Sequence, residues 1–127
     1  MLFIHLVLVV FENLTLSTRH ASKSKTFSDS YVVHKYRHRT HYGVIQKIFF
    51  VEELKRYLLK IQPFENINYD VLQIGSRKFF NEHIIFGTFS KQEIHLVQME
   101  NIIEKACYYQ NNDTCYFARY ANLYESS

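Results

Sequence analysis

The stretch Tyr42-Gly-Val-Ile-Gln-Lys-Ile-Phe-Phe-Val-Glu-Glu-Leu-Lys-Arg-Tyr-Leu-Leu-Lys-Ile-Gln-Pro-Phe64 is the densest apolar and β-branched block in the middle of the chain. In residues 44–51 both alternating faces are mainly apolar, which is typical of a strand that is covered on two sides or bends around a barrel. Gly43, without a Cβ, would let a second backbone approach closely. The charged residues 52–55 predict a turn, and residues 56–62 the returning strand of a hairpin.

A helix competes with this hairpin over the second half of the block. Val51, Leu54, Leu58 and Ile61 follow helical spacing, and acidic and basic side chains four residues apart at 52 and 56 would pair on a helix. Pro63 ends either element, since the residue before a proline avoids the helical region. These residues alone leave the choice open.

Length and composition predict one mainly β domain. The 127 residues include 47% hydrophobic and 17% aromatic side chains, with ten Tyr, eleven Phe, three Gly and one Pro. Such a composition excludes disordered, collagenous and low-complexity chains, and its aromatic and branched residues favour strands. We expect a small, partly open antiparallel barrel over residues 1–121 and a frayed tail over 122–127.

The elements around the central block can be placed by their patterns. Before it we expect a core strand at 2–11, a half-buried strand at 14–17, a mobile basic loop at 19–30, a strand at 31–36 and an exposed basic turn at 37–41. After it we expect a loop at 65–70, strands at 71–74, 79–82, 84–89 and 94–97, a helical turn near 99–104 that places Ile102 and Ile103 on the core, and a hairpin closed around 110–113.

Positive charge is concentrated in residues 19–41, where Asp29 is the one acid, although the net charge of the chain is only +3. Such an arm indicates an anionic partner, and a solvated, charge-rich loop is the alternative. The candidate nucleic-acid-binding residues are Lys23, Lys25, Lys35, Arg37 and Arg39. The tyrosines interleaved with them, which could stack on bases or simply pack in the core, are Tyr31, Tyr36 and Tyr42.

Two further patterns bear on the cellular compartment in which the protein works. The apolar run at 1–11 is far shorter than the ~20 residues that span a bilayer, and it lacks the basic start of a signal peptide, so we expect no membrane span and favour a strand over secretion. Cys107 and Cys115 flank the last predicted turn. A local disulfide is conceivable if the loop is 110–112, but two free thiols fit better.

No spacing of titratable residues places them on a common face. The histidines at 34, 38 and 41 with Asp29, or Asp70 with Glu82, could in principle support acid–base chemistry, and the histidines could hold a metal. Because none of these sets has the spacing of a known site, we predict no catalytic residue, no metal and no cofactor.

Taken in order, three stretches resemble a bromo-adjacent homology (BAH) domain, a β-rich barrel-like module of chromatin proteins. They are Tyr-Gly-Val-Ile-Gln-Lys-Ile-Phe at 42–49 with the strand that ends at Pro63-Phe64, Asn-Glu-His-Ile-Ile-Phe at 81–86, and residues 94–119, which include Lys-Ala-Cys at 105–107 and Tyr-Phe-Ala-Arg at 116–119. The chain departs from the family in the extra residue Ala106 and in having no Trp. The layout also resembles small β modules of uncharacterised proteins encoded by mobile elements.

The resemblance implies a hairpin rather than a helix at 52–61 and a role at chromatin. We therefore expect a non-enzymatic binding module, located in the nucleus, that binds DNA, a nucleosome or an acidic protein surface through the basic arm at 19–41. The alternatives are a protein-interaction module, a non-functional fragment of a mobile-element protein, and a small secreted β protein.

Overall fold

The computed structural model describes residues 3–6, 8–11, 14–19, 30–111 and 114–119. These residues form an eight-stranded sheet and a separate two-stranded sheet, and every pairing is antiparallel. The elements are β1 (Phe3–Leu6), β2 (Leu8–Phe11), β3 (Leu14–Ser17), β4 (Tyr31–Tyr36), β5 (Arg39–Val51), β6 (Arg56–Ile74), β7 (Arg77–Phe89), β8 (His95–Gln98), the 3-10 helix η1 (Met99–Asn101), β9 (Ile102–Asn111) and β10 (Thr114–Arg119). The predicted mainly β, antiparallel fold is confirmed.

The central block is the hairpin of β5 and β6. Val51 pairs with Arg56, and the four residues between them turn the chain, with the amide of Lys55 donating to the carbonyl of Glu52 at 3.3 Å. The competing helix over residues 51–61 is therefore excluded. The predicted close approach of a second backbone at Gly43 is also confirmed, because a Cβ there would lie 2.8 Å from the carbonyl oxygen of Gln62.

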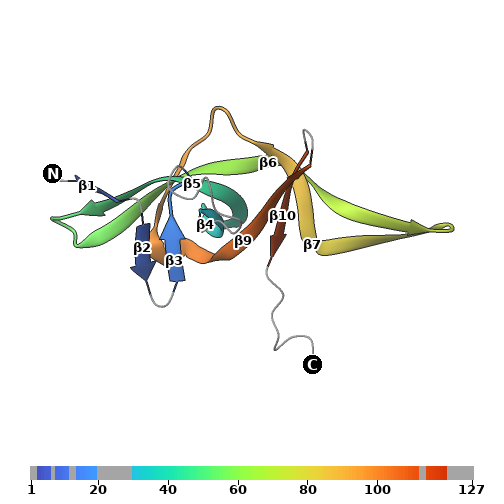
Figure 1. Ribbon diagram of the computed structural model, residues 1–127, viewed down its shortest axis with the longest axis horizontal. Coiled ribbons are helices and arrows are strands. Elements are labelled where there is room, and N and C mark those ends of the chain that lie inside the picture. The colour runs from blue at the N-terminus through green and yellow to red at the C-terminus, as the bar shows by residue number, and fades with distance from the viewer. Residues whose placement is uncertain (1–2, 7, 12–13, 20–29, 112–113, 120–127) are drawn as a thin grey trace, which may run out of the picture.

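Two long strands connect the halves of the large sheet. β6 pairs with β5 and β8 up to Pro63 and with β7 from Phe64 onward, while β9 pairs first with β4 and then with β10. The sheet order is β1-β5-β4-β9-β10-β7-β6-β8, with an additional β5–β6 pairing, so the strands bend around one another while β1 and β8 lie at the two ends of the order. Figure 1 shows the β5–β6 tip projecting from one end and the β6–β7 tip from the other.

The core consists of two clusters on opposite faces of β4 and β5. One contains Val32, Ile45 and Ile48, and the other contains Val33 and Val44. A register shift between Ile45 and Lys47 explains why two residues three apart share a face. Val44 and Ile45 are therefore buried on opposite faces, as predicted for a strand covered on two sides, whereas Lys47 further along the strand is exposed.

The second cluster is mainly aromatic and centres on Phe117, which is fully buried. Its ring lies within 6 Å of five other aromatic rings, those of Tyr31, Tyr42, Phe64, Phe89 and Tyr108. Most of these pairs meet edge to face, the arrangement that the charge distribution of the rings favours. This cluster fixes β10 against the centre of the sheet.

Three sequence predictions are corrected. The N-terminal run is two short strands rather than one core strand, with Val9 buried but Phe3 and Leu8 exposed. Residues 65–70 belong to β6, because an exposed two-stranded arm needs few apolar side chains to satisfy its backbone. The helical turn is shorter than expected and ends at Asn101. Its successor Ile102 packs against the core, but Ile103 is 41% exposed.

Candidate functional site

The hairpin of β4 and β5 carries the basic residues that the sequence singled out and the structure describes. Lys35, Arg37 and Arg39 are all exposed, and Tyr36 pairs with Arg39 across the turn. The guanidinium carbon of Arg37 lies 5.2 Å from the centroid of the Tyr36 ring, a cation–π contact. The two-residue turn and the ends of the two strands beside it thus expose three cations.

The turn itself has an uncommon backbone. Arg37 and His38 both have positive φ, +51° and +66°, the combination that a type I′ hairpin turn requires. Asn and Gly usually occupy these positions, because a side chain with a bulky Cβ is strained there. The strands on either side, with Val32 and Val33 fully buried, hold the chain in this conformation.

Beneath the turn lies a cluster of histidines from three strands. His34 of β4 and His95 of β8 are buried, and Nε2 of His34 is 3.0 Å from Nδ1 of His95. His41 of β5 lies with its ring centroid 4.8 Å from that of His95, and the Tyr36 ring stacks on His95 at 3.8 Å. The hairpin therefore rests on β8 through aromatic contacts.

This cluster keeps the two buried imidazoles neutral. Burial, together with the neighbouring His95 and His41, lowers the pKa of His34 to about 3. Burial also lowers the pKa of His95, with His41 acting in the same direction and Glu93, whose carboxylate lies 3.7 Å from Nε2 of His95, acting against it. His34 and His95 are therefore uncharged packing residues at neutral pH.

The predicted aromatic residues occupy three different environments. Tyr31 is only 7% exposed and its ring stacks on Tyr108 at 4.1 Å, and burial raises the pKa of its hydroxyl. Tyr42 is half-buried and packs against the aromatic cluster, and Tyr36 covers His95. Of the three, Tyr36 is the one that lies beside the exposed cations. Lys23 and Lys25 lie outside the described residues.

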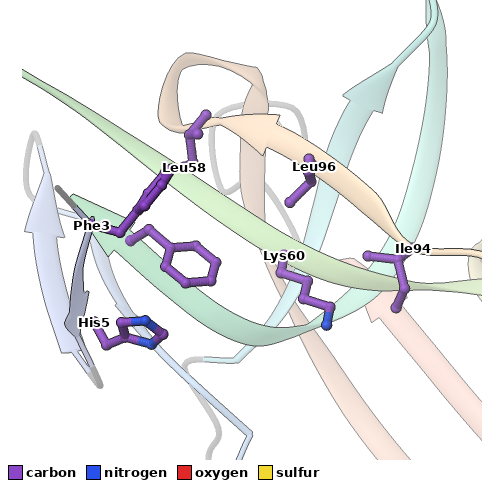
Figure 2. Close-up of a pocket in the computed structure, with 7 residues that line it drawn as sticks. Phe3, His5, Leu58, Lys60, Ile94 and Leu96 are labelled. Carbon is purple, nitrogen blue, oxygen red and sulfur yellow. The ribbon is translucent and has the colours of Figure 1, made fainter. Parts of the chain in front are cut away.

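A second surface feature was not predicted from the sequence. The outward face of β1, β5, β6 and β8 carries a groove of about 400 Å³. Figure 2 shows its lining side chains, which come from strands far apart in the chain. They are Phe3, His5, Phe49, Leu58, Lys60, Ile94 and Leu96. The alternation at 94–97 was recognised, but the sequence could not indicate that His95 and Val97 point inward while Leu96 is 60% exposed.

A lysine lines this groove, and its partner on the neighbouring strand is also a lysine. Lys60 lines the groove, and Lys47 on β5 is the cross-strand partner of Lys60, two pairs along from Phe49 and Leu58. Partners in an antiparallel pair point to the same face, so the side chains of Lys47 and Lys60 leave the same face of the sheet. Elsewhere the described cations include paired ones, since Lys55 binds Glu52 and Arg119 binds Glu104.

Other site types find no support among the described residues. No group of three or more His, Cys, Asp or Glu there is arranged to hold a metal ion. Within the same residues no helix has the length and apolar character needed to cross a bilayer. Cys107 and Cys115 are free thiols.

Comparisons with family models, with curated proteins and with solved structures find no match to this chain. The resemblance to a BAH domain therefore stays a prediction from the sequence motifs.

Proposed function

We propose that this chain is a non-enzymatic binding module that binds nucleic acid through the β4–β5 hairpin, with chromatin in the nucleus as the site of action. The observation that carries the proposal is the display of Lys35, Arg37 and Arg39 on one exposed hairpin. Cations of this kind bind phosphates and release the counterions that surround a nucleic acid. The contact of Arg37 with Tyr36 keeps one guanidinium near an aromatic ring that a base can share.

The hairpin is also a firm platform for such contacts. Its strands are fixed by the register from Tyr31–Val44 to Tyr36–Arg39, and its inner face packs on β8 through the histidine cluster. Cations that are held in place lose less freedom on binding than cations on a loose segment. Recognition by this hairpin is expected to be tolerant of sequence, because phosphate contacts carry no base information.

A titration of duplex DNA at several salt concentrations tests the proposal. Contacts from the three cations predict a slope of log affinity against log salt of about −3, from roughly −0.9 for each phosphate neutralised. The double variant Arg37→Gln/Arg39→Gln should weaken binding and reduce the slope by about 2. The matched control, Lys55→Gln/Arg56→Gln, removes the same charge from the β5–β6 tip and should leave the slope unchanged.

Two results would overturn the proposal. One is a salt-independent affinity, and the other is an equal loss in the control and hairpin variants. Co-purified proteins that survive high salt and nuclease treatment, without DNA binding, would favour a protein-interaction module instead.

A further inference from the structure

We propose that the groove on β1, β5, β6 and β8 binds a single-chain amphiphile, with its hydrocarbon chain on the apolar lining and its anionic head group, of the carboxylate class, between Lys47 and Lys60. This site is separate from the β4–β5 hairpin and does not depend on nucleic-acid binding. Its volume of about 400 Å³ falls in the range of small-molecule pockets, which are ≈ 300–1,000 Å³.

The groove leaves large apolar side chains in contact with water. Phe3 is 47% exposed and Leu96 60%, while Phe49 and Leu58 form the half-buried floor. Neighbouring rings already order this floor, since Phe49 meets the edges of Phe3 at 6.1 Å and His5 at 4.7 Å between centroids. A contiguous exposed apolar surface of this kind marks a place where something apolar binds.

The lysine pair supplies the second chemical requirement. Lys47 and Lys60 occupy directly opposed positions, and like charges so placed destabilise a sheet. An anion between the ammonium groups converts this repulsion into two attractions. The polar and apolar parts adjoin, because Lys60 pairs with Leu96 on β8, and Phe49 with Leu58, two pairs along β5 and β6, is the next pair on the same face.

The same geometry argues against other occupants. Strands β1, β5, β6 and β8 pair with one another across the floor, so the floor offers side chains rather than free backbone groups to an extended peptide. Nucleic acid would need cations along a track, whereas here they are grouped beside an apolar surface. A second copy of the chain packed about a two-fold axis would bring both lysine pairs to one interface, where their like charges would repel.

Calorimetric titration with monomeric decanoate tests the inference. Decanoate should bind saturably at one site, and butyrate, which lacks the long chain, and decyltrimethylammonium, which reverses the charge, should each bind at least about tenfold more weakly. In Lys47→Gln/Lys60→Gln the affinity for decanoate should fall by about tenfold. The variant Leu96→Ser should lower the affinity by removing apolar contact while both lysines remain.

Matched controls separate this site from the DNA-binding hairpin. Lys35→Gln/Arg37→Gln removes the same charge, and it should impair DNA binding while leaving decanoate binding unchanged; Lys47→Gln/Lys60→Gln should do the reverse. Thermal unfolding of each variant verifies that the chain is folded. The inference is overturned if decanoate fails to saturate, if decyltrimethylammonium binds as well as decanoate, or if the protein binds anionic vesicles but not monomeric decanoate.

Discussion

Nε2 of His34 lies 3.0 Å from Nδ1 of His95, so two buried imidazoles on β4 and β8 are joined by one hydrogen bond. Nδ1 of His34 is buried without a hydrogen-bond partner among the described residues. This geometry fits a neutral His34 that donates from Nε2, because a bare nitrogen is less costly to bury unpaired than a charged N–H. The pair connects the strand that carries the basic hairpin to the strand that borders the groove.

This pair predicts that acid destabilises the fold. The pKa of His34 is lowered to about 3 in the folded state, against 6.5 in an unfolded chain. Between these values the unfolded chain binds a proton that the folded chain does not, so stability is complete above pH 6.5 and is lost as the pH falls below it. From pH 6.5 to 5 the loss from His34 alone should be about 2 kcal/mol, at roughly 1.4 kcal/mol per pH unit.

Urea unfolding at pH 7, 6 and 5 measures this loss. His34→Gln should make the dependence on pH flatter, because the amide does not titrate, whereas the exposed His5→Gln should leave it as in the parent. Charges facing the pair act on His95 from three elements, Arg37 and His41 lowering its pKa and Glu93 raising it. A stability that is constant from pH 7 to 5 would contradict a neutral buried pair.

Gly43 and Gly75 should respond differently to alanine. A Cβ on Gly43 would lie 2.5 Å from the Ile61 side chain and 2.8 Å from the carbonyl oxygen of Gln62. Because backbone must move, Gly43→Ala should cost about 1–3 kcal/mol of unfolding free energy. Gly75 has open space but a φ of +61°, so Gly75→Ala should cost about 1 kcal/mol through strain.

Asparagine distinguishes these two mechanisms. Asn tolerates the left-handed region, so Gly75→Asn should be milder than Gly75→Ala, while Gly43→Asn should be worse than Gly43→Ala. Denaturant unfolding of the four variants gives the comparison. Equal effects at both positions would show that close packing around Gly43 does not determine how much an added side chain there destabilises the fold.

The fold was predictable where local pattern and turn chemistry agree. The strand Leu14–Ser17, the strand Tyr31–Tyr36 and the strands of the last hairpin were placed from residue types alone, and the structure confirms them, whereas residues 52–61 left helix and hairpin open. Residues 65–70 were misassigned because polar side chains suit both a loop and a solvated two-stranded arm. The N-terminal run was misassigned because apolar composition cannot distinguish a buried strand from one at the end of the sheet order.

Of the two candidate sites, the sequence could indicate the hairpin but not the groove. The hairpin cations lie close together in sequence, so charge counting found Lys35, Arg37 and Arg39 without knowledge of the fold. The groove combines Phe3, Phe49, Leu58 and Leu96, which only the strand register brings together. Lys47 lies opposite Lys60 because the strand register shifts after Ile45. No local sequence pattern indicates this shift.

The two cysteines should not form an internal disulfide. The pair Asn111–Thr114 closes the last hairpin, so Cys107 lies opposite Ala118 and Cys115 opposite Gln110. The cysteines are three pairs apart, about 10 Å along the ladder, and they point to opposite faces. This separation exceeds the ~7 Å between Cα atoms that a disulfide allows.

Alkylation followed by mass spectrometry tests this arrangement. Unfolded in the presence of iodoacetamide and without reductant, each chain should gain two adducts, even after mild oxidation at low protein concentration. Cys107→Ser and Cys115→Ser, each leaving one thiol, should each gain one. A monomer that loses two mass units and resists alkylation would contradict the register of β9 and β10.

The positive φ angles at Arg37 and His38 predict that binding and stability conflict at the hairpin turn. The double variant Arg37→Asn/His38→Gly supplies the residues that a type I′ turn favours, and it should stabilise the fold by about 1 kcal/mol through relief of strain. For a domain of this size that gain raises the melting temperature by roughly 4 °C. The same variant removes one of the hairpin cations and should weaken DNA binding, with a salt slope smaller by about 1. A variant that keeps the cation, His38→Gly, should gain part of the stability and retain the parent slope, so a loss of DNA binding there would show that the turn conformation, rather than the charge of Arg37, governs binding.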